Sequence, residues 1–210
     1  MRRILAILLL AALIGAVHAG ALEDGYAAWE RKDYATARKL WEPLARQHDP
    51  DALFNLGLLY KNGQGVPKDI RKAMDYFKQA AWYGSVDAAY NLGVLYIDKI
   101  YGYPSKKDAL NWWRQAAEAG HPESQYNLGV MYAYGMGTRA DGALAIKWWE
   151  KAARQGNRNA IEALVRVYSE GLFGQPKDPA KAAKWKRLLE QTTAGRLKRS
   201  GAAILNTNSK

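Results

Sequence analysis

The heptapeptide YNLGVLY occupies residues 90–96, and YNLGVMY occupies residues 126–132, 36 residues later. A fixed period of about 20–50 residues is typical of repeat architectures. At this period three positions of the heptapeptide recur beyond its two copies. They are the leucines Leu56, Leu92, Leu128 and Leu164, the tyrosines Tyr60, Tyr96, Tyr132 and Tyr168, and the glycines Gly57, Gly93 and Gly129. The chain is therefore expected to be a tandem repeat.

The second half of each unit repeats as well. It carries an alanine, then two adjacent aromatic residues, and it closes on a glycine. These positions are Ala73, Ala109 and Ala145, the doublets Tyr76 and Phe77, Trp112 and Trp113, and Trp148 and Trp149, and the glycines Gly84, Gly120 and Gly156. A fourth unit has one extra residue, so that Ala182 and Trp185 take the alanine and first aromatic places.

Within a unit the apolar spacing is helical. Leu53, Leu56 and Tyr60 are three and four residues apart and share one face of a first helix. Gly63 and Gly65 interrupt the pattern, and a second helix follows with Ala73 and Phe77 on one face. One helix pair cannot bury its apolar face alone, so neighbouring pairs are expected to stack into a continuous core. A shorter pair at residues 25–47 is interpreted as a divergent first repeat.

Two features of the repeat are interpreted as packing rather than as a site. Gly57 and its counterparts lie in mid-helix, where glycine costs about 1 kcal/mol against alanine. We expect that the missing side chain lets the second helix approach closely. The aromatic doublets invite a carbohydrate or cofactor interpretation, but aromatic residues at helical spacing in every unit favour a core role, for instance for Trp113 and Trp149.

The first full unit carries the pattern A-x-x-x-L-G-x-x-Y-x-x-G-x-G-V, followed by D-x-x-K-A-x-x-Y-F-x-x-A-A-x-x-G, from Ala52 to Gly84. This pattern resembles the Sel-one-like repeat (SLR), a branch of the tetratricopeptide superfamily. The resemblance covers residues 22–191 and implies an all-α, right-handed α-solenoid of about five antiparallel helix pairs without a sheet. The repeats are expected at about residues 22–49, 51–86, 87–122, 123–158 and 159–191.

Some units depart from this pattern. In the second unit Lys99 and Tyr101 stand where the family has loop glycines, so a different loop geometry is expected there. The fourth unit has Val165 for the mid-helix glycine and Lys186 for the second aromatic residue. A last repeat with one polar face is expected, because nothing stacks on that face.

The first 21 residues have the pattern of a secretory signal peptide. Arg2 and Arg3 precede an uncharged, mostly apolar run over residues 4–17, and small residues follow. Cleavage is expected after Ala19 or Ala21, and an uncleaved membrane anchor is the alternative. The expected location is periplasmic or secreted. The chain contains no cysteine, so packing alone must hold the fold together.

No catalytic, metal or cofactor site is predicted. His48 and His121 each precede a turn, and neither belongs to a H-E-x-x-H motif. The Gly63-x-Gly65 loop lacks the further glycine and lysine of a phosphate-binding loop and is expected to be a turn between helices. The chain is therefore expected not to be an enzyme.

A protein-binding surface is predicted on the first helices, which line the concave side in the tetratricopeptide class. Three aromatic residues stack there in register, and an asparagine follows each one: Phe54 and Asn55, Tyr90 and Asn91, Tyr126 and Asn127. Asparagine amides can donate to and accept from an extended peptide backbone. The alternative is that these asparagines form hydrogen bonds between adjacent repeats. The predicted function is a scaffold or adaptor for an envelope or secreted protein.

A second candidate surface is the basic C-terminal end. The formal net charge of the chain is +11, and residues 177–210 contribute +7 of it, from nine basic and two acidic residues. Binding to an acidic polysaccharide or an anionic lipid is predicted there, and nucleic acid is not expected. The alternative is a solvated last helix with a flexible tail at residues 192–210. The candidate residues are Lys181, Lys184, Lys186, Arg187, Arg196, Lys198 and Arg199.

Overall fold

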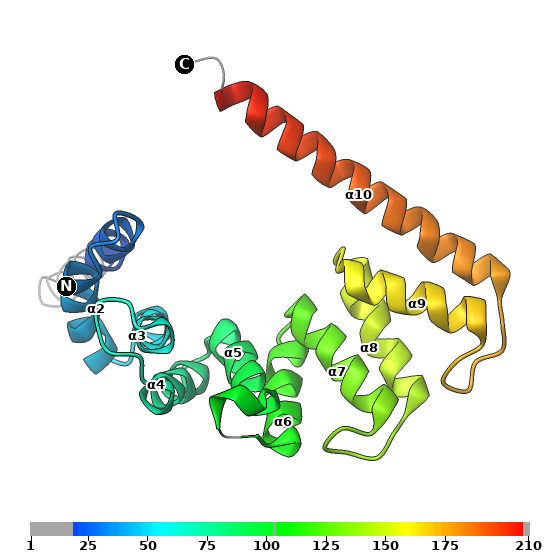
Figure 1. Cartoon of the computed structure of the whole chain (residues 1–210), viewed down its shortest axis with the longest axis horizontal. Coiled ribbons are helices and arrows are strands. Elements are labelled where there is room, and N and C mark those ends of the chain that lie inside the picture. The colour runs from blue at the N-terminus through cyan, green and yellow to red at the C-terminus, as the bar shows by residue number, and fades with distance from the viewer. Residues whose placement is uncertain (1–18, 103, 208–210) are drawn as a thin grey trace, which may run out of the picture. The chain divides into compact units, whose positions relative to one another are not determined.

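The structure, a computed structural model, describes residues 19–102 and 104–207, with side chains as far as residue 194. The described residues are helical and contain no strand (Figure 1). A helix at residues 19–30 precedes α2. The elements that follow are α2 (Tyr34–Arg46), α3 (Pro50–Asn62), α4 (Ile70–Trp82), α5 (Val86–Ile97), η1 (Lys99–Tyr101), α6 (Lys106–Glu118), α7 (Pro122–Tyr134), α8 (Gly142–Arg154), α9 (Arg158–Glu170) and α10 (Pro179–Thr207).

The helices form two compact units, Met1–Tyr103 and Pro104–Lys210. In the first unit α2 packs against α3, α3 against α4, and α4 against α5. In the second unit α6 to α10 do the same. Because short loops join helices that pack side by side, the chain builds consecutive antiparallel helix pairs. The predicted all-α fold of about five helix pairs is thus confirmed.

Local signals define the ends of the helices. The side chain of Asp49 accepts a hydrogen bond from the Ala52 amide at 2.7 Å, and that of Asp141 accepts one from the Leu144 amide at 2.9 Å. Such N-caps satisfy backbone donors that have no partner within the helix. At the other end of α3, Gly63 adopts φ 72°, a left-handed conformation that favours glycine. The predicted Gly-x-Gly turn between first and second helix is therefore present.

The loop of the second full unit differs, as Lys99 and Tyr101 predict. The C-cap of α5, Asp98, is extended instead of left-handed, and its carboxylate accepts a hydrogen bond from the Ile100 amide at 2.8 Å. One 3₁₀ turn, η1, follows, and it ends at Gly102 with φ 79°. The left-handed residue has thus moved four residues beyond the C-cap position, because non-glycine residues occupy the usual positions.

The mid-helix glycines are sites of close packing. A Cβ atom at Gly57 would lie 2.5 Å from the Phe77 ring, and one at Gly129 would lie 2.5 Å from Nε1 of Trp149. Each glycine therefore makes room for an aromatic residue of the second helix in its own repeat. This confirms the interpretation that glycine at these positions lets the second helix pack close to the first, at a cost in helix propensity.

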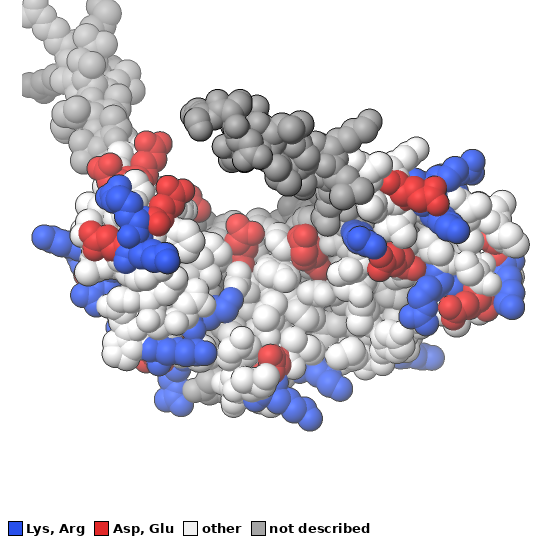
Figure 2. Space-filling model, turned by 45° about the horizontal axis from the view of Figure 1, so that its top comes forward, with Lys and Arg blue, Asp and Glu red and all other residues white. Residues whose placement is uncertain are grey.

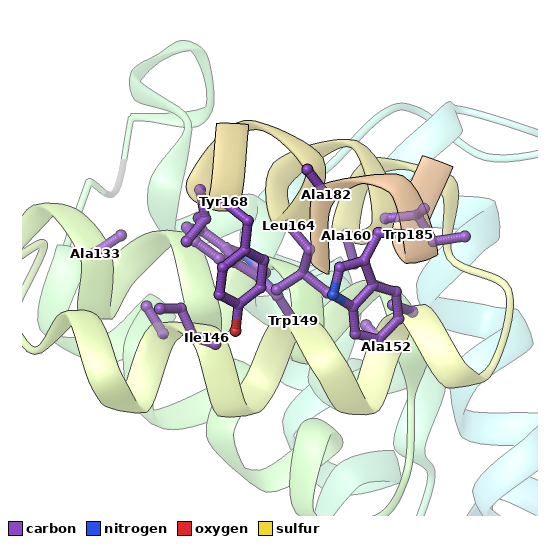
Figure 3. Packing of buried hydrophobic residues seen from close by; sticks show 13 residues of the cluster. Ala133, Ile146, Trp149, Ala152, Ala160, Leu164, Tyr168, Ala182 and Trp185 are labelled. Atoms are coloured by element: carbon purple, nitrogen blue, oxygen red, sulfur yellow. The ribbon is translucent and has the colours of Figure 1, made fainter. Parts of the chain in front are cut away.

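In the second unit α8, α9 and the first turns of α10 share one buried cluster (Figure 3). It includes Trp149 from the second helix of one repeat and Leu164 and Tyr168 from the first helix of the next. The last repeat adds Ala182 and Trp185, as the shifted register of the fourth unit predicts. The second aromatic residues of the doublets, Trp113 and Trp149, are thus core in this unit, while the first ones, Trp112 and Trp148, are half-buried.

The two ends of the chain carry the predicted signal peptide, its alternative as a membrane anchor, and the predicted flexible tail. Residues 1–18, most of the expected signal peptide, lie outside the described residues. Residues 192–207, part of the expected flexible tail, continue α10 as helix, and residues 208–210 lie outside the described residues. Among the described residues, none of the helices is both long and apolar enough to cross a membrane.

Candidate interaction surfaces

In the first unit the predicted first-helix face begins on α3 with Phe54 and Asn55. Phe54 is half-buried, and its ring lies 5.7 Å from that of Phe77. Asn55 is only 5% exposed, and its amide nitrogen has no hydrogen-bond partner within the structure. In this structure the Asn55 amide is buried and does not reach the surface where a peptide would bind, so its predicted role in binding stays a prediction. The Asn55 side chain lies on the buried side of the helix, next to Leu56.

On α5 the next pair, Tyr90 and Asn91, is half-buried. The Asn91 side-chain oxygen accepts a hydrogen bond from Nζ of Lys61 at 2.8 Å, and its amide nitrogen donates to the Asp87 carbonyl at 2.9 Å. Burial lowers the pKa of Lys61. Since Lys61 belongs to α3, this hydrogen bond links two adjacent repeats. Asn91 thus fulfils the alternative structural role, and Tyr90 is the stronger candidate for contact with a partner.

In the second unit α7 carries Tyr126 and Asn127, which are both half-buried. The Tyr126 carbonyl accepts a hydrogen bond from Nε1 of Trp149 at 3.1 Å, and burial raises the pKa of its phenol. Gln125, one position earlier, is buried, and its Nε2 donates to the Ala117 carbonyl of the preceding repeat at 3.1 Å. Its side-chain oxygen accepts a hydrogen bond from Nε2 of Gln155, within its own repeat, at 2.8 Å. In α7 the hydrogen bond between repeats is therefore made by Gln125.

The basic residues at the start of α10 are exposed, but two of them interact with their own repeat. Nζ of Lys181 lies 3.3 Å from the Asp178 carboxylate and 5.0 Å from the centre of the Tyr168 ring. Lys184 lies over Trp185, with 6.0 Å between Nζ and the ring centre. Lys186 and Arg187 are also exposed. The side chains of the other candidates, Arg196, Lys198 and Arg199, lie outside the described residues.

A basic groove that the sequence analysis did not identify lies in the first unit, at the N-terminal end of α4. Its volume is about 700 Å³, within the range of ligand-binding cavities. Four cationic side chains line it: Arg38, Lys68, Arg71 and Lys72. Asp69, also at the groove, is the N-cap of α4, and its carboxylate accepts a hydrogen bond from the Lys72 amide at 2.9 Å. Arg38 lies 3.5 Å from Glu42 on the same helix.

A second cavity of about 490 Å³ adjoins the basic groove, and Lys72 lines both. It lies between α2 and α4, the second helices of neighbouring repeats, over Leu53 and Leu56 of α3. The stacked rings of Tyr60 and Tyr76, with centres 5.6 Å apart, separate the two hollows. Nζ of Lys72 lies 4.2 Å above the centre of the Tyr60 ring, and the hydrogen bond to Tyr60 raises the pKa of Lys72.

The histidines have structural surroundings. His121 is the N-cap of α7, where its Nδ1 accepts a hydrogen bond from the Ser124 amide at 3.1 Å. The His48 ring stacks on Tyr83, with centres 4.6 Å apart. In the described part of the chain, histidine and acidic side chains do not cluster in a way that could hold a metal ion.

The helix pairs coincide with matches to a family of known repeats. The Sel1 repeat matches residues 19–49, 50–81, 86–121, 122–157 and 163–185. The chain belongs to the Sel1 repeat family. The SLR interpretation is thus confirmed. Sel1 repeats generally mediate protein–protein interaction and generally act as non-catalytic scaffolds.

Solved structures show the same fold. The crystal structure of c5321, a protective antigen present in uropathogenic Escherichia coli strains, is 35% identical, with a TM-score of 0.79 over 83% of this chain. A Sel1 repeat protein from Oxalobacter formigenes is 27% identical, with a TM-score of 0.73 over 83% of this chain. The matched parts are 38% of c5321 and 70% of the Oxalobacter protein.

A shorter match joins the chain to a plant protein. A segment of 44 residues is 43% identical to the ERAD-associated E3 ubiquitin-protein ligase component HRD3B of Arabidopsis thaliana. It spans 21% of this chain and 7% of the plant protein. The match therefore concerns the repeat and not the plant protein as a whole.

Proposed function

We propose that the protein is a non-catalytic scaffold in the periplasm or cell envelope of a Gram-negative bacterium, where it binds a protein segment on its first helices. The observation that carries this proposal is the equivalent placement of Tyr90 on α5 and Tyr126 on α7, both half-buried. A half-buried tyrosine has a fixed ring that still offers part of its apolar face. Tyrosine is enriched at protein interfaces for this reason.

Three further points support the proposal. The chain belongs to a family whose repeats generally mediate protein–protein interaction. HRD3B is by its name a component of a larger assembly. The basic start, the apolar run at residues 4–17 and the small residues that follow support export.

The first test uses in-cell photocrosslinking. A photoreactive amino acid replaces Asn127 in the full chain, or, as a control, the exposed Lys147 on the second helix α8. We expect one defined protein of the cell envelope to be captured from position 127 and not from position 147. Capture of the same proteins from both positions would contradict a specific first-helix surface.

The double substitution Tyr90→Ala and Tyr126→Ala is expected to abolish this capture, because both aromatic anchors are removed. Trp82→Ala is the control, since Trp82 is an exposed aromatic residue on a second helix. It should leave capture unchanged. Circular dichroism and thermal unfolding check that both variants remain folded. If the folded double variant captures the same partner as the wild type, the first-helix assignment is wrong.

The exposed Lys184, Lys186 and Arg187 favour a second candidate function, binding of an acidic polysaccharide or an anionic lipid at the C-terminal end. The cations follow one another within one turn of α10 and reach the solvent. Charges of one sign that lie close together add to a local field that attracts polyanions. On the face drawn in Figure 2, by contrast, basic and acidic side chains are interspersed.

Deletion of residues 192–210 tests this second candidate. We expect weaker retention on heparin and weaker binding to vesicles that contain phosphatidylglycerol, because Arg196, Lys198, Arg199 and Lys210 are removed. The difference between the deleted and the full chain should shrink as salt is added, since salt screens exposed charges. Equal retention of the two chains at low salt would contradict a contribution of residues 192–210 to polyanion binding.

A further inference from the structure

The basic groove of the first unit is a second interaction surface, separate from the first-helix face. Lys68 lies in the loop before α4, while Arg71 and Lys72 lie in its first turn. Arg38 is contributed by α2, the second helix of the preceding repeat. The hollow therefore depends on the packing of two repeats, and it concentrates positive charge at one place.

The chemistry of the groove favours carboxylates. Its single acidic residue among the described lining side chains, Asp69, already caps the helix. The Tyr60 hydroxyl stabilises the charged form of Lys72, and the Lys72 ammonium stays near the tyrosine ring at 4.2 Å. Cations that lie close together attract an anion from solution and hold it by charge-assisted hydrogen bonds.

The lining of the adjoining cavity indicates which class of molecule can occupy both hollows. Its floor is apolar, with Ala45, Leu53 and Leu56, and Tyr76 forms a wall. Asp75 and Glu42 at its rim repel further carboxylates. An occupant of both hollows thus needs an anionic part beside an apolar part. A polypeptide offers both within a few residues, whereas an acidic polysaccharide or a polyphosphate offers no comparable apolar side chain.

We propose that this double hollow between α2 and α4 binds an acidic peptide segment of a partner protein, with carboxylates at Lys68, Arg71 and Lys72 and a neighbouring apolar side chain over Leu53 and Leu56. The rim of the surface lies mainly on the second helices α2 and α4, and Phe54, Tyr90 and Tyr126 are not among its lining residues. A partner bound there can therefore leave the first-helix face unoccupied. The protein would then bridge two segments, each on its own set of helices.

Fluorescence anisotropy with a labelled peptide tests the proposal on the full chain. The probe carries three glutamates followed by a leucine and a phenylalanine, and two matched peptides replace either the glutamates by glutamines or the apolar pair by serines. We expect saturable binding of the probe that weakens with salt. Both matched peptides should bind several-fold more weakly, because one lacks the carboxylates and the other lacks the apolar side chains that the two hollows are proposed to bind.

Charge-reversal variants test whether the probe peptide binds in the basic groove. Lys68→Glu with Arg71→Glu is expected to weaken probe binding at least about tenfold, because attraction becomes repulsion. Lys106→Glu with Lys107→Glu makes the same change in net charge at the exposed start of α6 and should leave binding unchanged. Thermal unfolding checks that each variant is folded.

Three results would overturn the proposal. They are equal binding of the groove variant and the wild type, equal binding of the peptide without the apolar pair, and full competition by heparin or polyphosphate at matched charge. The variant with Tyr90→Ala and Tyr126→Ala should bind the probe like the wild type. The proposal for the groove and the proposal for the first-helix face can therefore be contradicted independently of each other.

Discussion

Truncation of Trp149 to alanine is expected to lower the free energy of unfolding by about 3–5 kcal/mol, the usual cost of removing a large buried aromatic side chain. Trp149 is 3% exposed, and its ring lies 5.6 Å from that of Phe173. Its Nε1 donates to the Tyr126 carbonyl, so the truncation also removes a hydrogen bond within the repeat. Urea denaturation followed by circular dichroism measures the change.

The matched control is Trp82→Ala, which removes the same side chain from a site that is 85% exposed. Because little of Trp82 is buried in the fold, its loss should change the free energy of unfolding by less than about 0.5 kcal/mol. Equal losses for the two variants would show that Trp149 does not hold the second unit together as its burial implies.

Substitution of Gly129 by alanine is expected to destabilise the protein, although alanine is the better helix former. Helix propensity favours alanine by about 1 kcal/mol, but overpacking of a core typically costs about 1–3 kcal/mol. The new Cβ atom would lie 2.5 Å from Nε1 of Trp149 and 3.0 Å from the Ala145 carbonyl oxygen. We expect a net loss of about 1–2 kcal/mol in urea denaturation.

A double-mutant cycle with Trp149→Phe identifies the cause. The phenylalanine ring is smaller than the indole, so Gly129→Ala should cost less in that background than in the wild type. An unchanged cost would mean that the glycine is not required for the approach of Trp149. A gain in stability from Gly129→Ala alone would contradict close packing at this position.

Most of the fold was predictable because its signals are local and repeated. Leu56, Gly57 and Tyr60 recur at a period of 36 with helical spacing, so the helix pairs and their buried faces follow from the sequence. The altered loop at Lys99 and Tyr101 was also predictable from a local signal. The loop normally requires a left-handed conformation, which glycine adopts without the steric cost that other residues have.

The interaction surfaces were less predictable. The sequence places Asn55, Asn91 and Asn127 at equivalent positions, yet Asn55 is buried and Asn91 bonds to Lys61 of the preceding repeat. Whether such a side chain faces solvent, a partner or a neighbouring repeat depends on what packs beside it. The asparagine recurs in three repeats, but the side chain that reaches Asn91 from the preceding repeat does not, because Ile97 stands 36 residues after Lys61.

The sequence by itself determined the repeat, the helix pairs and the residues of the core, because the 3.6-residue period of a helix and the conformational demands of glycine act between near neighbours. Only the tertiary structure decided which charges meet. Arg38 is 30 residues from Lys68, and their meeting at one groove depends on how α2 packs beside α4. No local pattern records such a juxtaposition, because it arises when two repeats stack and bring distant side chains to one surface.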